Sequence, residues 1–443
     1  MTIQLSDHFT YKKLFRYVLP SILLMIFTSL YSVVDGFFVS NFVGKTSFAA
    51  INLVMPFLMG ISTVGFMFGT GGSAIVSMTL GQGKSDLANR YFSLIVYATF
   101  ILGLVFSLFG IIFTEKVAIF FGATGDLLKE CVVYGRIYFI FMPIFMLQVM
   151  FQSFFVVAEK PNYSLIVTIV AGVANMILDY VFIALFDWGI AGAAYATGVG
   201  ICIGGFVPVF YFFRQHNSSP LRLGKTSFYG RILVKSCTNG ASEMVSNLSA
   251  SVVGMLYNFQ LMKYAGENGV AAYGVLMYAS FTVVAIFTGY TMGSSPIVSY
   301  HFGAKNHDEL KNMFKKGLFI MSIGSLILVL VCEFFLQPIV AIFTGYDSTL
   351  TEMTVLGGRI CFLSFLFTGI NIWGSGFFTS LNNGLVSGLI SVLRTFVFQI
   401  IVILILPVIF GLNGIWYAIV LAELLACFVT VIFLVSYRKK YGY

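Results

Sequence analysis

The chain has 443 residues, of which 59% are hydrophobic and only 9% are charged. Globular domains carry about 25% charged residues, and a surface this apolar could not be hydrated. The composition therefore excludes a water-soluble protein and predicts an all-α integral membrane protein, in which each helix satisfies its own backbone hydrogen bonds.

Twelve apolar runs of about twenty or more residues follow one another along the chain, each long enough to cross a hydrocarbon core of about 30 Å. The first is not a cleavable signal peptide, because it is too long, carries Asp35 and lacks a small-residue cleavage site. Pro20 is expected to bend this first helix. The predicted transmembrane helices cover residues 14–40, 48–78, 91–113, 131–157, 162–186, 190–213, 236–262, 270–300, 315–343, 355–380, 386–410 and 413–436.

The second half of the chain repeats the first. The segment GGSAIVSMTLGQGKSD, which begins at Gly71, aligns with GSSPIVSYHFGAKNHD, which begins at Gly293, 222 residues later. The segment GIAGAAYA from Gly189 matches GLNGIWYA from Gly411 at the same spacing, and residues 135–137 match 358–360 at a spacing of 223. A repeat of this length in a membrane protein is typical of a transporter.

The number of helices between the copies fixes the symmetry of the repeat. Six predicted helices separate each motif from its copy, so both copies enter the membrane in the same direction. The two halves are therefore parallel six-helix lobes related by a pseudo-twofold axis along the membrane normal. We expect lobe one at residues 1–213, a cytoplasmic linker at 214–235 and lobe two at 236–443.

The glycine-containing loops of the repeat, Gly81 to Lys84 and Gly303 to Lys305, are interpreted as tight turns between helices. A phosphate-binding loop would follow a β-strand and open a helix with a GK[ST] motif, and neither copy does so. We therefore expect an ion gradient, and not ATP, to be the energy source.

The net charge of the chain is +8, and the distribution of its basic residues indicates how the chain is oriented in the membrane. With both termini in the cytoplasm, 18 Lys and Arg residues lie inside and six outside, while Arg394 falls in or near the eleventh helix. This distribution follows the positive-inside rule. The excess of Lys and Arg is therefore explained by membrane orientation and does not predict a nucleic-acid partner. The six Cys and four His show no metal-ligand spacing, so no metal site is expected.

Four acids within predicted helices are candidates for ion binding, because an ionised side chain inside the membrane costs about 2.5–3.5 kcal/mol: Asp35, Asp179, Glu243 and Glu423. Tyr31 precedes Asp35 by one turn, and Asn175 precedes Asp179 by one turn, so each of these two acids has a polar neighbour. Buried carboxyls that face one another can take up and release protons near ambient pH. The alternative is structural hydrogen bonding between helices. Intramembrane aspartyl proteases carry YD and GxGD motifs on adjacent transmembrane helices, and the predicted helices contain neither motif, so no enzyme is expected.

With these residues the sequence resembles the multidrug and toxic compound extrusion (MATE) transporters over nearly its whole length. The likeness rests on twelve helices in two parallel lobes, the short turn after the second helix, and Pro20 upstream of Asp35. In archaeal members the resemblance implies a proton or sodium site, to which Tyr31, Asp35, Asn175, Asp179 and Thr197 would correspond here. A fourth-helix tyrosine also belongs to that network, and either Tyr134 or Tyr138 could supply it.

The sequence departs from the family's sodium-coupled branch, which carries acids in helices seven and ten. Ala250 and either Thr368 or Asn371 stand at those places, while Glu243 and Glu423 lie elsewhere as weaker candidates for ion binding. The segments YKKLFRYVLPS and SLYSVVDG look most like the bacterial multidrug exporters. At a spacing of 222, Asp35 falls on Tyr257 and Asp179 on Ile401, so the candidate ion site belongs to lobe one alone.

The resemblance implies a monomeric antiporter in the bacterial cytoplasmic membrane. It would export cationic amphipathic organic compounds in exchange for H⁺ or Na⁺, by alternating access of the two lobes, and would need no cofactor besides the coupling ion. The alternative from the same superfamily is a lipid-linked intermediate flippase, which tends to have fourteen helices and an Arg-lined cavity. A receptor or sensor would normally carry a soluble signalling domain, and the chain shows none.

Overall fold

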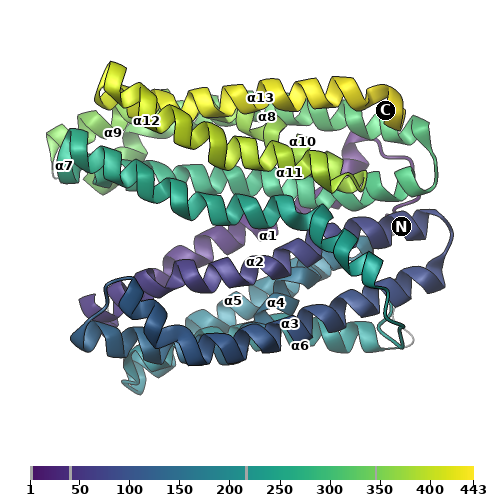
Figure 1. Ribbon diagram of the computed structural model, residues 1–443, viewed down its shortest axis with the longest axis horizontal. Helices are drawn as coiled ribbons and strands as arrows, with labels where there is room; N and C mark the ends of the chain where they lie inside the picture. Colours follow the sequence, from purple (N-terminus) through teal and green to yellow (C-terminus); the bar gives the residue numbers. More distant parts are fainter. Residues whose placement is uncertain (1–2, 39–41, 215–217, 345–346) are drawn as a thin grey trace.

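The computed structural model describes residues 3–38, 42–214, 218–344 and 347–443, and every regular element in these ranges is a helix (Figure 1). Within the described ranges, eleven helical segments are long and apolar enough to cross a membrane. The elements are α1 (Tyr11–Phe38), α2 (Lys45–Gly81), α3 (Ser85–Phe120), α4 (Gly125–Val157), α5 (Pro161–Asp179), η2 (Tyr180–Leu185), α6 (Gly189–Phe213), α7 (Gly230–Gly303), α8 (His307–Thr344), α9 (Ser348–Cys361), η3 (Phe362–Ser364), α10 (Phe365–Ser380), α11 (Gly384–Val392), η4 (Leu393–Val397), α12 (Phe398–Phe410) and α13 (Leu412–Tyr441).

The helix α7 supplies two of the twelve predicted crossings. Its 74 residues are interrupted at Gly266, whose φ of 62° is not helical. A straight helix of that length would extend about 110 Å, several times the hydrocarbon thickness. The break gives a first arm, residues 230–265, and a second arm, residues 267–303, and the twelve crossings agree with the prediction.

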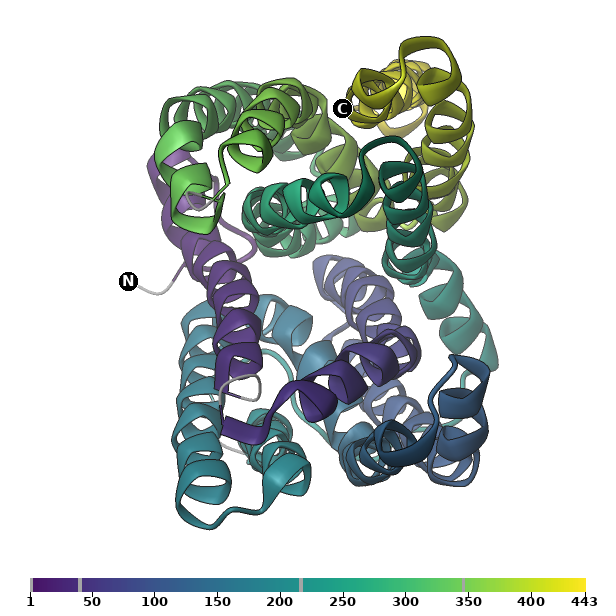
Figure 2. The same cartoon turned by 90° about the vertical axis from the view of Figure 1, so that its left-hand side faces the viewer.

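Figure 2 shows the two halves of the chain end on, one above the other. Each lobe shares its core with the first helix of the other. Leu14 and Val18 of α1 belong to the large core cluster of lobe two. In the same way, Leu233 and Met244 of the first arm of α7 pack on a core cluster of lobe one. The exchange is what a parallel duplication predicts, since α1 and the first arm of α7 are the equivalent first helices of the two lobes.

Glycines allow the two lobes to approach closely. A side chain at Gly81, at the end of α2, would collide with the carbonyl of Tyr300, and one at Gly303 would collide with the carbonyl of Met78. Further into the lobes, Ser77 donates a hydrogen bond to the carbonyl of Pro296 at 2.6 Å. The lobes are therefore in direct backbone contact at the end of the molecule where α2 ends.

The turns after α2 and α7 are tight, as predicted. Gly83 has φ 75°, and Lys305, in the second copy, takes the same left-handed conformation at φ 57°. The turns that follow α4 and α10 form a second matched pair, with Glu159 at φ 60° and Asn382 at φ 56°. These two residues are 223 apart, so the repeat has a spacing of 223 in this part of the chain.

The segment before α1 connects the two lobes at this same end. The Leu5 amide donates to Glu159 Oε1 at 2.8 Å, on the loop between α4 and α5. The Phe9 amide donates to Glu309 Oε1 on α8 at 3.0 Å, and Lys316 Nζ donates to the Phe9 carbonyl at 2.6 Å. One short segment is thus bound to lobe one and to lobe two.

The lateral surface of the bundle is apolar. Leu108 and Ile112 on α3 are 65% and 66% exposed, and Phe334 on α8 and Val408 on α12 are exposed to a similar degree. Side chains of this kind are stable in contact with lipid and not with water. The structure is therefore a transmembrane helical bundle, which agrees with the fold class predicted from composition.

Candidate functional site

Two of the predicted site residues lie on the buried face of α5. Asn175 is 1% exposed and Asp179 is completely buried. They are one turn apart, so their side chains lie on the same face of the helix. The helix changes to a π-helical turn, η2, directly after Asp179. Such turns occur often at functional sites, because the wider turn re-aims neighbouring side chains.

Small residues bring α1 and α6 close to this part of α5. Gly172 lies against the rings of Phe27 and Tyr31 from α1, at 2.8 Å and 3.6 Å from where its Cβ would stand. On the other side, Gly200 of α6 lies 3.0 Å from the Ala171 carbonyl and 3.2 Å from Cβ of Asn175, measured in the same way. The structure therefore gathers Tyr31 and Asn175 between three helices, with Asp179 one turn further along α5.

Thr197 also lies on α6, three residues before Gly200, and is 8% exposed. Its hydroxyl donates to the Ala193 carbonyl of its own helix at 3.0 Å. A hydroxyl in that state keeps its oxygen lone pairs available to a proton or a cation.

Asp35 belongs to α1 by its backbone. Its side chain, with those of residues 32–38, lies outside the described residues, so its predicted role stays a prediction. Pro20 lies inside α1, where a missing amide hydrogen weakens the helix, and its predicted bend is likewise an expectation.

The two tyrosines proposed for α4 are both buried, with Tyr134 1% and Tyr138 2% exposed. Their ring centroids are 6.0 Å apart. Because they belong to the same buried face of one helix, the structure does not choose between them.

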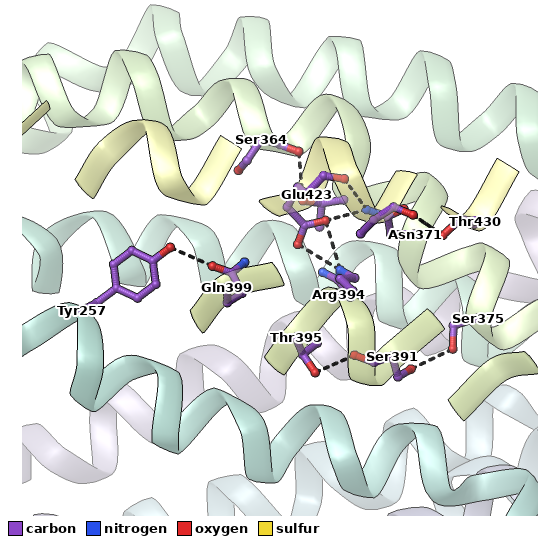
Figure 3. Close-up of polar contacts among 12 residues, drawn as sticks. Tyr257, Ser364, Asn371, Ser375, Ser391, Arg394, Thr395, Gln399, Glu423 and Thr430 are labelled. Atoms are coloured by element: carbon purple, nitrogen blue, oxygen red, sulfur yellow. Dashed lines mark hydrogen bonds and ion pairs between the residues drawn. The ribbon is translucent and has the colours of Figure 1, made fainter. Parts of the chain in front are cut away.

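Lobe two holds a different polar cluster, shown in Figure 3, around the predicted residue Glu423 on α13. Arg394 Nε donates to Glu423 Oε1 at 2.9 Å and to Oε2 at 3.1 Å, and the two side chains are 14% and 9% exposed. Asn371 Nδ2 donates to Glu423 Oε2 at 2.7 Å, and Thr430 donates to Asn371 Oδ1 at 3.1 Å. Glu423 is thus neutralised by one cation and held by one amide.

Arg394 lies in the π-helical turn η4, and Glu243 lies on the first arm of α7, partly buried. Arg394 is the charged group that acts on Glu243 through space, although the two are too far apart for an ion pair among the described contacts. Among the described contacts, Arg394 therefore pairs with Glu423 and not with Glu243.

The pairing of Arg394 with Glu423 was not predicted from the sequence, where the two residues were considered separately. A signal was present. One apolar helix contains a single Arg, and the next contains a single acid. The two helices form a hairpin, and opposite charges on neighbouring helices usually pair inside a membrane. Within the described ranges, no group of three or more His, Cys, Asp and Glu residues could hold a metal ion.

Comparison with known proteins places this arrangement in a family. The family model MatE matches the chain twice, at residues 20–181 and again at 244–405. The chain is 24% identical over 436 residues to the multidrug export protein MepA of Staphylococcus saprophyticus, covering 97% of this chain and 94% of that protein. MepA of Staphylococcus aureus strain MRSA252 is similar to the same extent.

Solved structures share the fold. A crystal structure of MATE in complex with MaL6 superposes with a TM-score of 0.91 at 21% identity, covering 97% of this chain and 96% of that chain. An outward-facing multidrug resistance MATE family transporter of the MOP superfamily gives the same values. The two-lobe, twelve-crossing architecture is therefore an established fold, and the double match agrees with the repeat seen in the sequence.

Proposed function

Because the chain belongs to the MatE family of membrane transporters, and is not an enzyme, we propose that it exports cationic amphipathic organic compounds in exchange for H⁺ or Na⁺. Its relatives named as multidrug export proteins support the substrate class. The coupling ion would bind at Asp35 and Asp179, with Asn175, Tyr31 and Thr197 as neighbouring polar groups and Tyr134 or Tyr138 as a further hydroxyl.

The observation that carries this proposal is the complete burial of Asp179 beside Asn175, where α1, α5 and α6 meet. A carboxylate inside a lipid bilayer is costly unless it binds a proton or a cation. A proton or a Na⁺ ion that binds reversibly would meet this requirement and would couple the site to an ion gradient.

In the proposed cycle, ion binding from outside neutralises the lobe-one acids and favours release of the cationic substrate. The lobes then rock to the other orientation, the ion leaves, and the recharged acids favour uptake of a new substrate. One pH unit across the membrane supplies about 1.4 kcal/mol for each coupled proton. The backbone contacts between lobes at Gly81 and Gly303 support a structure that is closed at that end.

Both termini would lie in the cytoplasm of a bacterial cell, with the chain acting as a monomer in the cytoplasmic membrane. The distribution of Lys and Arg supports this orientation. In lobe two, the ion pair of Glu423 with Arg394 favours a structural role for Glu423. Glu243 forms no ion pair among the described contacts, and this favours Glu243 over Glu423 as an ion-binding candidate.

A flippase for a lipid-linked intermediate is the alternative. It would need a cationic cavity for the phosphate groups of its substrate. The described part of the chain offers Arg394 within the helices of lobe two, already neutralised by Glu423. Twelve crossings and a single engaged arginine give this alternative less support.

Purified protein in liposomes tests the proposal. Ethidium transport is measured with a pH gradient and a Na⁺ gradient imposed separately, for the wild type, Asp179→Asn, and Glu267→Gln as an exposed acid-to-amide control. We expect at least one gradient to drive transport in the wild type and the control, and neither to drive it in Asp179→Asn. Absence of gradient-driven transport in the wild type would reject the antiporter, and wild-type rates in Asp179→Asn would remove this acid from coupling.

A further inference from the structure

The linker between the two lobes lies along the outside of lobe one at the terminus-bearing end, the end of the molecule where Figure 1 marks both termini. Its residues 222–229, here called the strap, are bonded to α3. Thr226 Oγ1 donates to the Arg90 carbonyl at 2.7 Å. Further along α3, the Tyr97 hydroxyl donates to the Gly224 carbonyl at 3.1 Å. The strap therefore belongs to the surface of lobe one.

The strap lies where the surface of α3 changes from charged to apolar. Arg90 is the last charged residue of α3 before Glu115. Tyr97 begins a row of exposed apolar side chains that continues with Phe100 and Ile101. Arg90 and Tyr97 are about 10 Å apart along the helix, and the headgroup layer of one leaflet is roughly 5–8 Å thick. The strap therefore lies at the level of the lipid headgroups.

Four exposed basic side chains gather on and beside the strap. Within the described part of the chain, none of the four forms an ion pair. The sequence has no Asp or Glu at residues 87–114 or 214–242, and the nearest acid along α3 is Asp86, one turn before Arg90. This surface is therefore positively charged. The four residues are Arg90 of α3, Arg222 and Lys225 of the strap, and Arg231 in the first turn of α7.

The repeat builds an equivalent arrangement on lobe two. At the spacing of 222, α8 corresponds to α3, and Asn312 corresponds to Arg90. The segment before α1 lies on α8 there, since Asn312 Nδ2 donates to the Phe9 carbonyl at 3.0 Å. In both copies, the segment that precedes the first helix of one lobe thus lies on the third helix of the other.

The segment on lobe two, however, lies among acids. Lys13 forms an ion pair with Asp7 at 2.7 Å, and His8 Nδ1 lies 2.6 Å from Glu309 Oε2. These two basic side chains are therefore bonded to carboxylates of the protein itself. The strap carries no acid of its own, so its positive charge is left for an anion outside the protein.

An exposed phenylalanine indicates which kind of anion fits. Phe228, in the strap between Lys225 and Arg231, is 81% exposed. Aromatic rings and basic side chains occur together at membrane interfaces, where the rings contact acyl chains and the cations contact headgroups. A soluble anion would bind the basic residues and leave this ring in water, whereas a phospholipid contacts both.

We propose that the strap, together with Arg90 and Arg231, is a binding surface for anionic phospholipids of the leaflet at the terminus-bearing end. The guanidinium groups of Arg90, Arg222 and Arg231 can each bind a phosphate through two N–H donors. Lys225 adds a further positive charge, and Phe228 lies among the acyl chains. The strap continues directly into α7, so a bound lipid also holds the start of this helix against lobe one. Neither the coupling ion nor the exported compound enters into this proposal.

Fluorescence quenching by brominated lipids tests this surface in the full-length protein. Phe228→Trp places a reporter in the strap, and the emission of the unchanged protein, which has three native tryptophans, is subtracted. The protein is reconstituted into phosphatidylcholine liposomes that contain increasing mole fractions of brominated phosphatidylglycerol or of brominated phosphatidylcholine. The first lipid is anionic and the second has no net charge, so the comparison isolates the effect of headgroup charge.

We expect half-maximal quenching at a mole fraction of brominated phosphatidylglycerol at least about fivefold lower than that of brominated phosphatidylcholine, which is the effect of about one basic side chain at an anionic surface. The difference should shrink as the salt concentration is raised, because salt screens exposed charges. Equal quenching by the two lipids would overturn the proposal without any further variant.

Charge-removing variants of the Phe228→Trp protein show whether the strap is responsible for the preference. Arg222→Gln, Lys225→Gln and Arg231→Gln together should reduce the preference for phosphatidylglycerol to less than about twofold. These side chains are exposed, so their replacement leaves the packing of the lobes intact. A triple variant that keeps the full preference would show that the lipid binds elsewhere.

The matched control removes the same charge from the equivalent region of lobe two. Lys305→Gln, Lys311→Gln and Lys315→Gln together replace three exposed lysines at the start of α8, where Asp308 and Glu309 lie among them. The control should retain the preference at Phe228→Trp. An equal loss in the control would show that the lipid responds to the total charge of the protein and not to the strap.

Discussion

Gly81 and Gly303 are equivalent residues of the two repeats, 222 positions apart, and each lies against the backbone of the other's helix. Gly81 faces the Tyr300 carbonyl and Gly303 faces the Met78 carbonyl, and Met78 and Tyr300 are themselves 222 apart. The pair therefore marks the pseudo-twofold axis at the terminus-bearing end. Any movement that opens this end must separate both contacts together.

The first prediction concerns this contact. Gly303→Ala places a Cβ against a backbone carbonyl, which cannot move aside as a flexible side chain can. We expect the variant to destabilise the closed end by about 1–3 kcal/mol, the usual cost of overpacking. The measurement is the melting temperature in detergent, together with the accessibility of an added cysteine in the turn after α2.

Gly324→Ala is the matched control, because a Cβ on Gly324, in the middle of α8, has no atom within 4 Å. This control should stabilise its helix by roughly 1 kcal/mol, as glycine-to-alanine changes do in open helical positions. Equal melting temperatures for the two variants would show that the glycine contact has no influence on lobe closure.

The second prediction concerns the ion pair of Arg394 and Glu423. Removing one partner of a buried pair typically costs about 3–5 kcal/mol, whereas replacing both is often close to neutral. We therefore expect Arg394→Met and Glu423→Gln each to lower the melting temperature, and the double variant to recover most of the loss. A double-mutant cycle in detergent measures the coupling between them. Additive losses would mean that the two side chains stabilise the fold independently.

The third prediction concerns pH. Burial raises the pKa of Glu159 above its ordinary value of 4.5, and the nearby Asp7 charge adds to the effect, while the Leu5 amide opposes it. The folded state therefore binds the proton more tightly than the unfolded state, and the stability that Glu159 contributes falls as pH rises above about 4.5. Glu159→Gln keeps an oxygen for the Leu5 amide and removes the charge.

The melting temperature of Glu159→Gln relative to the wild type should therefore increase as pH rises above 4.5, and should become constant above the raised pKa of Glu159. Glu159→Ala, which loses the hydrogen bond to Leu5, should be less stable than Glu159→Gln at every pH in this range. A difference between Glu159→Gln and wild type that is independent of pH would show that the carboxyl does not titrate with a raised pKa in the folded protein.

The fourth prediction concerns the packing of the proposed ion site. Gly200→Ala puts a methyl group 3.0 Å from the Ala171 carbonyl and 3.2 Å from Cβ of Asn175, so α5 must shift away from α6. We expect gradient-driven ethidium transport to fall although every polar residue of the site is retained. Gly324→Ala again serves as the control, and transport at the wild-type rate in Gly200→Ala would show that the site tolerates this displacement.

Hydropathy and the internal repeat were sufficient to predict the fold, because both depend on local sequence. They did not reveal that α7 is helical on both sides of Gly266, because the predicted helices at 236–262 and 270–300 left residues 263–269 as a loop. The contacts of α1 with Gly172 and of α6 with Asn175 also could not be predicted, because they depend on which faces Gly172 and Gly200 present to their neighbours. The burial of Asp179 did follow from its position in an apolar helix.

The pairing of Arg394 with Glu423 has an electrical consequence for transport. Moving one elementary charge across the membrane changes the energy by about 2.3 kcal/mol for each 100 mV. The pair has no net charge, so displacement of α13 and η4 together moves no charge through the field. The voltage dependence of the cycle should therefore report the charge of the coupling ion, the substrate and the other acids inside the membrane, and current recorded under voltage clamp measures it.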